Sequence, residues 1–337
     1  MMFFKGIGAL VLTLAAFTAF SFKCPKGDKA MGGLAEAAVA TFLVEAIFAY
    51  ICGDFFGIEF LGEVGHASGG MGAVASAALV GLAMGTNPTF AVATAAAVSG
   101  FGILPGFIAA YILHFILKVM VKYLPAGVDV IIGTLFAAAA GRAIAVLVDP
   151  FVNGLISTVG DAITVATEQS PLMMGLILGG MMKVVCTSPL SSMALTAMLG
   201  LTGLPMGIAA IACFSGAWTD GMTFLRLKLG DRSRCIAVML EPLTQADIVA
   251  KNPIPIYGSN FFGGACGGVV AATLGIINNA PGTASPIPGL LAPFAFNEPG
   301  TVVLALALGA SGGILAGFIC STIYKKLGFG NAEVPQN

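Results

Sequence analysis

The sequence predicts an all-α fold: a polytopic transmembrane helical bundle of about 10 to 11 spans, with broken or re-entrant helices and two parallel internal repeats. Hydrophobic residues make up 58% of the 337 residues and charged residues only 9%, which leaves too little polar surface for a water-soluble protein. Apolar runs reach the roughly 20 residues that a membrane-spanning α-helix needs, whereas a β-barrel would show alternating runs of about 10. We therefore expect a multi-pass protein of the cell (inner) membrane.

The first expected span is taken as a retained helix rather than a signal peptide, because Ser-Phe-Lys at 21–23, before Cys24, is not a small-x-small cleavage site. The segments 88–102 and 189–202 are too short to cross a bilayer comfortably, so each is either a half-helix or a re-entrant segment. The expected spans are 4–22, 31–52, 65–84, 88–102, 105–122, 126–148, 171–187, 189–202, 205–217, 256–279 and 301–323.

The internal repeat is defined by Pro and Gly breaks. Thr-Asn-Pro at 86–88 and Leu-Pro-Gly at 104–106 recur as Thr-Ser-Pro at 187–189 and Leu-Pro at 204–205 before Gly207. In a membrane transporter, matching breaks in two halves point to a substrate site. If both short segments cross, each repeat has an even number of crossings, so the repeats enter from the same face and are parallel.

The chain divides into four expected regions. Residues 1–30 form an N-terminal helix and basic loop, and 31–122 form the first repeat. Residues 123–234 hold the second repeat, within 126–217, and a basic cytoplasmic loop. Residues 235–337 form a C-terminal membrane segment with a Pro-rich re-entrant loop.

The positions of charged residues and prolines predict where the loops lie and which of them are re-entrant. Lys118, Lys122 and the basic residues around 226–234 fall on one side, which the positive-inside rule places in the cytoplasm. Polar residues between 149 and 170 predict an amphipathic segment on the outer surface. Residues 280–299 hold five prolines and much apolar sequence, which favours a re-entrant hairpin over an ordinary helix.

Charged residues inside expected spans are the first functional candidates, because a charge in the bilayer is costly. They are Glu36, Glu45, Arg142 and Lys183. A pair such as Glu45 with Arg142 would either pin two helices together or take part in transport.

Glu298 is the sharpest single candidate for solute binding. It lies between Asn297 and Pro299 in a broken apolar segment, where a carboxylate and an amide suit the recognition of hydroxyl groups. The alternative is that Glu298 caps the following helix.

The starts of the two short segments supply further candidates. Asn87 and Ser188 precede proline, and Ser191 and Ser192 follow one turn later in the second copy. Helix N-termini there could hold an anionic or polyhydroxylic solute, or these side chains could simply cap helix ends.

The two histidines and seven cysteines give weaker signals. His66 precedes Ser-Gly-Gly at 68–70 and could line a cavity, whereas His114 shares a helix face with Lys118 and has an expected structural role. The cysteines are scattered without metal-ligand spacing and are interpreted as packing residues. No motif indicates a cofactor, a metal site or nucleic-acid binding.

Several motifs together resemble the phosphotransferase-system EIIC-like membrane proteins (type 2), the group that includes PfoR-type regulators. The resemblance covers roughly residues 65 to 325. It departs from the family where 282–286 lacks the glycine after serine and gains prolines. The matching motifs are Val-Asp-Val at 128–130, Asp-Pro at 149–150, Thr-Ser-Pro-Leu-Ser-Ser-Met-Ala at 187–194, Gly200 through Gly207, Thr-Gln at 244–245, Lys-Asn-Pro at 251–253, the run 282–289 and Asn-Glu-Pro at 297–299.

This resemblance implies a membrane permease subunit for a small polar, sugar-like solute, phosphorylated by a phosphocysteine on a separate cytoplasmic EIIB protein. Its Asn-Glu-Pro motif implies that Glu298 contacts the sugar, and its later signature adds Thr283 and Ser285 to the candidate substrate site. It also implies a homodimer. Without its own catalytic phosphocysteine, the chain alone is not expected to be an enzyme, although this point stays open.

Two other functions stay open at this stage. One is an ion-coupled or uncoupled transporter of a small organic solute, with Glu36, Glu45 and Arg142 as a relay. The other is a PfoR-like membrane regulator.

Overall fold

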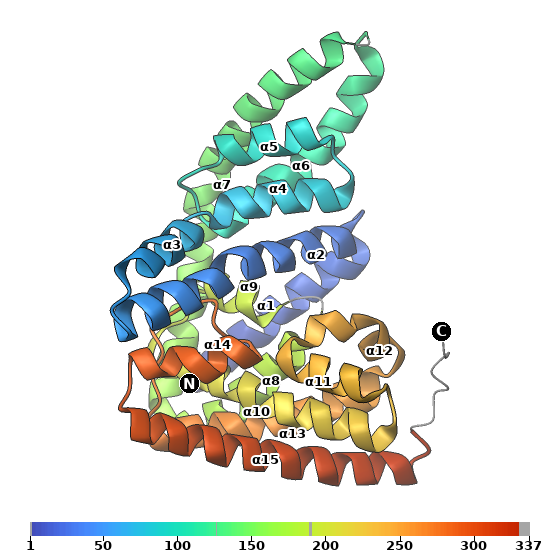
Figure 1. Cartoon of the computed structure of the whole chain (residues 1–337). Coiled ribbons are helices and arrows are strands. Elements are labelled where there is room, and N and C mark those ends of the chain that lie inside the picture. Colours follow the sequence, from blue (N-terminus) through green and yellow to red (C-terminus); the bar gives the residue numbers. More distant parts are fainter. Residues whose placement is uncertain (1, 126, 189–190, 330–337) are drawn as a thin grey trace. The chain divides into compact units, whose positions relative to one another are not determined.

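The computed structural model describes residues 2–125, 127–188 and 191–329, and within them every regular element is a helix (Figure 1). The predicted break at Pro189 lies outside the described residues. The chain forms two compact units. The N-terminal unit holds residues 10–160 and 197–200, and the C-terminal unit holds the remainder.

The N-terminal unit contains most of α1 and the helices up to most of α7. Helices α2, α4 and α6 pack side by side within it. The elements are α1 (Met2–Lys23), α2 (Gly27–Ala38), two π-helical stretches η1 (Val39–Leu43) and η2 (Ala46–Phe55), α3 (Glu59–Gly69), α4 (Gly72–Met84), α5 (Pro88–Ala97), α6 (Ile103–Met120), η3 (Val121–Tyr123) and α7 (Val128–Gln169).

The C-terminal unit is built on α8, α10, α13 and α15, which pack against one another (Figure 1). Its shorter elements lie between these helices in sequence. The elements are α8 (Pro171–Cys186), α9 (Ser192–Met198), α10 (Gly203–Leu227), α11 (Arg232–Leu240), η4 (Pro242–Gln245), α12 (Ala246–Lys251), α13 (Pro253–Leu274), α14 (Pro286–Leu291), η5 (Ala292–Ala295) and α15 (Pro299–Lys326).

The prediction of an all-α, multi-pass membrane protein is confirmed. Six helices among the described residues are long and apolar enough to cross a bilayer, and α3 with α4, bent by 54°, make up to seven. The predicted spans 88–102, 171–187 and 189–202 correspond to the shorter helices α5, α8 and α9, whereas 256–279 corresponds to α13, which has 22 residues but is not among the candidate segments. The six segments are Lys5–Lys23, Gly27–Asp54, Ile103–Tyr123, Val128–Gln169, Gly203–Leu227 and Pro299–Lys326.

The predicted amphipathic linker at 149–170 is wrong as a separate segment. Helix α7 runs without interruption through Pro150 to Gln169, over 42 residues. A proline removes one backbone hydrogen bond and costs about 3 kcal/mol, and the long continuous helix on both sides tolerates that local loss. At about 1.5 Å per residue, such a helix is longer than the roughly 30 Å hydrocarbon layer.

The two short segments are shorter as helices than the sequence indicated. Helix α5 has 10 residues and α9 has 7, so neither helix alone crosses a bilayer at about 1.5 Å per residue. The half-helix or re-entrant interpretation therefore fits them better than a crossing. The parallel repeat, which assumed that both cross, stays a prediction.

Glycines allow the helices of the C-terminal unit to approach closely. A Cβ atom at Gly264 would collide with the Gly179 carbonyl oxygen, and one at Gly268 with the Gly175 carbonyl oxygen. Without a hydrophobic effect between helices in lipid, small residues stabilise association by letting backbones approach. This packing brings α8, α10 and α13 together around the buried polar groups described below.

The loop between α13 and α15 is broken but well packed. Helix α13 ends at Gly275, whose φ of 66° suits glycine, and Asn278 N–H then donates to the Gly203 carbonyl over 3.0 Å. Pro286, Pro288 and Pro293 are buried in the short helices that follow. The prediction that residues 280–299 form no ordinary helix is confirmed.

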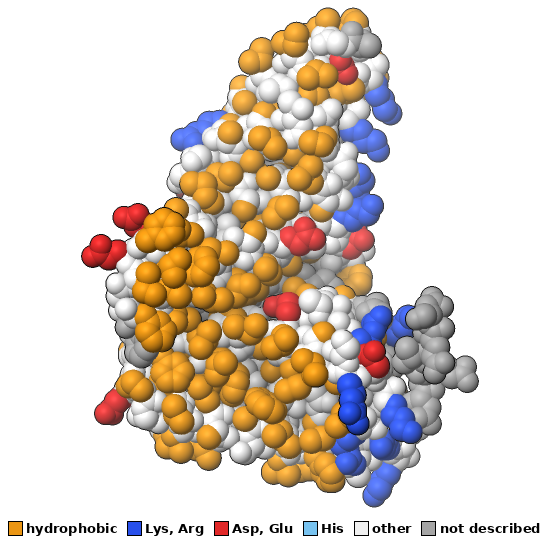
Figure 2. Space-filling model, viewed as in Figure 1, with side chains coloured by type: hydrophobic (Ala, Val, Ile, Leu, Met, Phe, Trp, Pro, Cys, Tyr) orange, Lys and Arg blue, Asp and Glu red, His pale blue; other side chains and the backbone are white. Residues whose placement is uncertain are grey.

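The outer surface of the long helices is mostly hydrophobic, as a lipid-facing surface requires (Figure 2). Several lysines lie at helix ends, for example Lys118 in the last turn of α6 and Lys325 and Lys326 in the last turn of α15. This distribution agrees with a membrane protein whose charged residues lie near the two interfaces.

Candidate functional site

A fully buried ion pair lies in the C-terminal unit. Lys183 Nζ, from α8, is 2.6 Å from Asp220 Oδ2, from α10, and the two side chains are 0% and 1% exposed. The lysine stem fits because Gly216 and Gly264 face it, and a Cβ atom at either position would collide with Lys183. Both partners are thus held by close helix packing, away from lipid and water.

A chain of polar contacts continues from this pair to the break after α8. Asn260, from α13, interacts with Asp220 and donates from Nδ2 to Thr187 Oγ1 over 3.0 Å. Thr187 is buried and is the C-cap residue of α8. Asn260 Oδ1 has no donor among the described residues, so a buried acceptor remains there.

Two broken segments meet at Ser192. Its hydroxyl donates to the Ala284 carbonyl, and Cys213 Sγ lies 3.8 Å from the same hydroxyl. Next to Ala284, Ser285 Oγ donates to Glu241 Oε2 over 3.3 Å. Segments almost 100 residues apart in sequence are therefore joined side by side.

Glu241 supplies a carboxylate at this junction. It lies between α11 and η4, outside the candidate spans, and its Oε1 also accepts from Leu243 N–H. Burial raises the pKa of the Glu241 carboxyl above its usual value, although these hydrogen bonds and Lys183 oppose the shift. We call the set Lys183, Thr187, Ser192, Asp220, Glu241, Asn260 and Ser285 the polar cluster.

The structure brings some predicted substrate-site residues to this cluster. Ser192 and Ser285 belong to it, and Ser191 is buried beside Ser192 with φ of 55°. Thr283 lies one residue before Ala284, where it accepts from Asn278 Nδ2 and donates to the Ala280 carbonyl. Ser188 Oγ donates to the Val185 carbonyl over 2.8 Å at the end of α8.

Within the described residues, the predicted pair Asn297 and Glu298 makes no hydrogen bond to the polar cluster. Asn297 ties its own loop: Nδ2 donates to the carbonyls of Ile277 and Pro293, and Oδ1 accepts from Ile277 N–H. Glu298 is exposed at the N-cap of α15, without a side-chain cap bond. Its role in solute binding stays a prediction.

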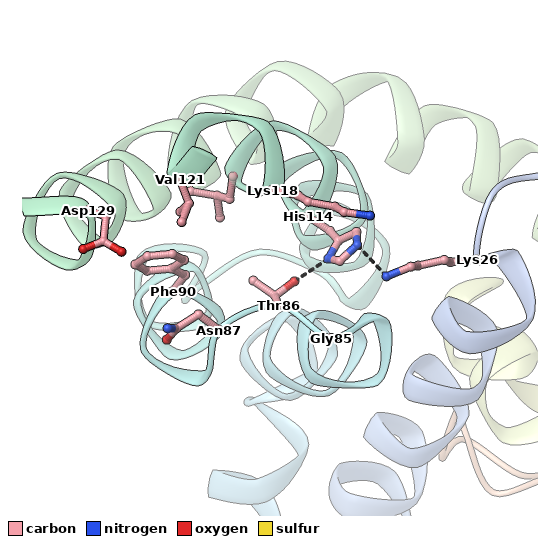
Figure 3. A pocket seen from close by; sticks show the side chains of 10 residues that line it. Lys26, Gly85, Thr86, Asn87, Phe90, His114, Lys118, Val121 and Asp129 are labelled. Atoms are coloured by element: carbon pink, nitrogen blue, oxygen red, sulfur yellow. Dashed lines mark hydrogen bonds between the residues drawn. The ribbon is translucent and has the colours of Figure 1, made fainter. Parts of the chain in front are cut away.

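A second polar site lies wholly within the N-terminal unit (Figure 3). It is a cavity of about 270 Å³ beside the break between α4 and α5, and we call it the Lys26 pocket. Its polar side chains come from the loop before α2, from the break between α4 and α5, from α6 and from the first turn of α7. They are Lys26, Thr86, Asn87, His114, Lys118 and Asp129.

His114 is the centre of a hydrogen-bond chain in the Lys26 pocket. Its Nε2 is 2.9 Å from Lys26 Nζ, and its Nδ1 is 2.8 Å from Thr86 Oγ1. Lys26 also donates to the Met84 carbonyl at the end of α4. Asn87 Oδ1 caps α5 by accepting from Thr89 N–H, and the predicted role of Asn87 in substrate binding stays a prediction.

The remaining charged candidates find local partners. Arg142 Nη1 donates to the carbonyls of Ala97 and Ser99, and its guanidinium lies over the Phe101 ring, so the suggested Glu45 pairing is wrong. A lysine or arginine satisfies exposed helix-end carbonyls better than it satisfies a distant carboxylate. His66 is exposed, and its ring packs edge-on against Tyr50 with ring centroids 6.4 Å apart, so its predicted role in lining a cavity stays a prediction.

Sequence reasoning missed three members of the polar cluster. Asp220 lay beyond the expected end of the span at 217, whereas α10 continues to Leu227. The need of Lys183 for a buried partner was a usable signal, because an unpaired charge in a span is costly. Asn260 and Glu241 gave no comparable signal, since only the fold brings them to the break.

Comparison with known proteins identifies one family. The family model described as "Phosphotransferase system, EIIC" matches residues 28–336. No curated protein and no solved structure matches the chain.

Proposed function

The chain belongs to the phosphotransferase-system EIIC family, and on that premise we propose that it moves a small polar, sugar-like solute across the inner membrane. It is a multi-pass transport component of that system. In the proposal, a separate cytoplasmic EIIB protein phosphorylates the solute, and the chain works as a homodimer.

One observation carries the choice of site: the bond from Ser192 to the Ala284 carbonyl, which joins two broken segments in the C-terminal unit. Where a membrane segment is broken, backbone groups and polar side chains become free to bind a solute. The polar cluster has a carboxylate and hydroxyl groups at this junction and an amide oxygen beside Thr187.

Glu241 is the proposed selecting residue. An ionised carboxylate accepts hydrogen bonds from two hydroxyl groups of one solute, and Ser285 already orients Oε2. Asn260 Oδ1 offers a further acceptor. Glu298 and Asn297 remain in the proposal as a second, more exposed contact, together with Thr283, Ser188 and Ser191 beside the cluster.

Solute binding by the purified protein tests this assignment. A panel of sugars and sugar alcohols is screened by thermal shift, and the best solute is then measured calorimetrically. We expect Glu241→Gln to weaken binding about tenfold or more, because hydrogen bonds to a charged group contribute about 1.5–3 kcal/mol. Ser192→Ala is expected to weaken binding less, whereas Ser311→Ala, an exposed helical serine on α15, serves as the matched control.

Glu298→Gln tests whether Glu298 rather than Glu241 binds the solute. Loss of binding in Glu298→Gln with unchanged binding in Glu241→Gln would move the site to the N-terminus of α15. Unchanged binding in both variants would exclude both assignments.

The pH profile of binding gives an independent check. Because burial raises the pKa of Glu241, the carboxylate is lost at a higher pH than for an ordinary glutamate near 4.3. We expect solute affinity to fall as pH is lowered through that raised pKa, and Glu241→Gln to flatten the profile. A profile unchanged by the substitution would contradict the proposed role.

Phosphoryl coupling is tested in proteoliposomes. Transport and solute phosphorylation are followed with and without phosphorylated EIIB protein on the cytoplasmic side. Net uptake that requires the phosphorylated EIIB supports the proposal, and equal uptake without any phosphoryl donor would refute the coupled version.

The buried ion pair favours one alternative, an ion-coupled transporter. Ionisable groups inside membrane segments often serve in proton pathways, and Lys183 with Asp220 is better placed for this than the relay predicted from Glu36, Glu45 and Arg142. Uptake that collapses with a protonophore and persists without EIIB would support this alternative.

A further inference from the structure

We propose that the Lys26 pocket binds a phosphate group, either of a soluble phosphate compound or of an anionic lipid headgroup. The pocket is formed entirely by residues of the N-terminal unit, so it is separate in composition from the polar cluster. The argument rests on the hydrogen-bonding capacity and charge of its side chains.

The two lysines supply most of the positive charge. Lys26 donates to the Met84 carbonyl and to His114 Nε2, which leaves the third N–H of its ammonium group free. Lys118 has no acceptor among the described residues. Figure 3 shows both lysines with His114 at one end of the pocket and Asp129 at the other.

His114 orients the donors of the pocket as a neutral imidazole ring. An ammonium group only donates, so His114 Nε2 accepts from Lys26, and the ring proton is assigned to Nδ1. Nδ1–H then donates to Thr86 Oγ1, which leaves the Thr86 O–H free to donate elsewhere. The hydrogen-bond network thus turns Thr86 into a donor.

Asn87 adds a fourth donor at the start of α5. Its Oδ1 is occupied by Thr89 N–H, so the Nδ2 amide group is the part that remains available. The N-terminus of a 10-residue helix also carries partial positive charge. Lys26, Thr86, Asn87 and Lys118 can therefore all donate into one cavity of about 270 Å³.

A phosphate group matches this arrangement. It carries several strong acceptor oxygens and at least one negative charge, whereas a neutral sugar would leave two ammonium groups unpaired. The only carboxylate among the named polar groups, Asp129, already accepts from Gly127 N–H over 2.8 Å. The cavity is smaller than the roughly 300–1,000 Å³ of drug-sized ligand sites, so it suits a phosphate group rather than a large nucleotide.

The neighbouring charges give independent support. Partial burial, and then repulsion from Lys118 and Lys29, lower the pKa of the Lys26 ammonium group. Two lysines that repel each other gain most when an anion lies between them. Lys118 also lies in the last turn of α6, at a helix end that the distribution of basic residues predicts to face the cytoplasm and its anionic lipid headgroups.

The test compares Lys118→Gln with Lys122→Gln. Lys122 is an exposed lysine that follows Lys118 by one helical turn and does not line the cavity, so it is the matched control. Among the residues that the structure describes, no hydrogen bond or ion pair holds the Lys118 side chain, so its replacement is not expected to unfold the protein. Binding of inorganic phosphate to full-length protein in neutral detergent is measured by calorimetry at fixed ionic strength, with sulfate as the competing anion.

The second arm measures the lipid source. The protein is placed in nanodiscs of phosphatidylcholine with or without phosphatidylglycerol, and the melting temperature is recorded for each variant. A phosphate affinity that falls about tenfold or more in Lys118→Gln, and is unchanged in Lys122→Gln, supports the site with a soluble phosphate compound as its ligand. A stabilisation by phosphatidylglycerol that is lost in Lys118→Gln, and kept in Lys122→Gln, supports the site with a lipid headgroup as its ligand. Solute binding at the polar cluster is expected to be unchanged in both variants, so failure here is distinct from failure of the proposed transport site.

Two results would overturn the proposal. One is the absence of both phosphate binding and phosphatidylglycerol stabilisation in the wild-type protein. The other is an equal loss in Lys118→Gln and Lys122→Gln, which would indicate general charge attraction at the basic helix end rather than a built site.

Discussion

The two breaks at Thr86 and Thr187 look alike in sequence, but the lysine near one is paired with a carboxylate and the lysines near the other are not. In the C-terminal unit, Lys183 faces Asp220 at 2.6 Å, and both side chains are buried. In the N-terminal unit, Lys26 and Lys118 repel each other around an open cavity. A matched, buried pair stabilises helix packing, whereas an unmatched pair beside a cavity is suited to bind an external anion.

The threonines at the two breaks show the same contrast on a smaller scale. Thr187 Oγ1 accepts from the buried Asn260 amide, so this contact is enclosed on all sides. Thr86 Oγ1 bonds to His114 at the edge of the Lys26 pocket. One threonine therefore helps to close a packed interior, and the other helps to arrange donors around a space that a ligand can enter.

The largest expected effect is the loss of the Lys183 charge. Lys183→Met leaves Asp220 buried without a cation, which costs about 3–5 kcal/mol and is a large part of the stability of a membrane domain. We expect most of the protein to be lost as aggregate in size-exclusion chromatography after extraction in mild detergent. The double variant Lys183→Met/Asp220→Leu is expected to recover folded protein, because neither charge is then left unpaired.

Lys118→Gln is the control for Lys183→Met, because it removes an unpaired lysine instead of a paired one. It removes a lysine from the N-terminal unit and relieves the repulsion on Lys26, so the melting temperature is expected to stay unchanged or to rise. If Lys183→Met were as stable as the wild-type protein, or Lys118→Gln as unstable as Lys183→Met, the contrast between matched and unmatched charges would be wrong.

The second effect concerns the packing that keeps the ion pair dry. A Cβ atom at Gly264 would collide with the Gly179 carbonyl and the stem of Lys183, so Gly264→Ala is expected to lower stability by about 1–3 kcal/mol. Gly300, in the first turn of α15, has open space around it and provides the control. Chemical denaturation followed by Trp218 fluorescence measures both; equal stabilities would show that α8 and α13 can separate without cost.

Most of the fold could be predicted from composition and run length, because a bilayer permits few backbone arrangements. The sequence also identified Lys183 and the breaks near Asn87 and Ser192. It could not identify Asp220 or Glu241 as partners, since their contacts with Lys183 and Ser285 depend on packing between distant segments. The role of Glu298 was inferred from its place in a broken apolar segment and from the Asn-Glu-Pro motif, and nothing in the described contacts tests it.

The third prediction compares the threonines directly. Thr187→Val removes one acceptor of the buried Asn260 amide and leaves only its interaction with Asp220, and we expect a loss of about 1–3 kcal/mol. Thr86→Val breaks a bond in a more open site, with an expected loss of about 0.5–1.5 kcal/mol, but it also removes a donor from the Lys26 pocket. Melting curves rank the stabilities, and phosphate titration is expected to respond to Thr86→Val only; a phosphate effect of Thr187→Val would contradict the separation.

The smallest expected effect is the pH dependence of stability in the N-terminal unit without a bound anion. The Lys26 pKa in the folded state is lowered, first by burial and then by Lys118 and Lys29, whereas the unfolded value is near 10.4. Between these two values the unfolded chain holds more protons than the folded protein, so the free energy of unfolding increases with pH. The groups around Lys26 include His114 and the more distant Asp129, and neither changes the sign in this alkaline window.

Lys118→Gln is expected to reduce this increase, because it removes one cause of the lowered Lys26 pKa, whereas Lys122→Gln is expected to leave it unchanged. Melting temperatures are measured from pH 8 upward for each variant and for the wild-type protein. The difference between the two removes the contribution of the other lysines to the pH dependence. Added phosphate should reduce the increase as well, since an anion between the two ammonium groups raises the Lys26 pKa again. A pH dependence identical in Lys118→Gln and the wild-type protein would mean that the two lysines do not share one site, and the comparison with the paired charges of the C-terminal unit would lose its physical basis.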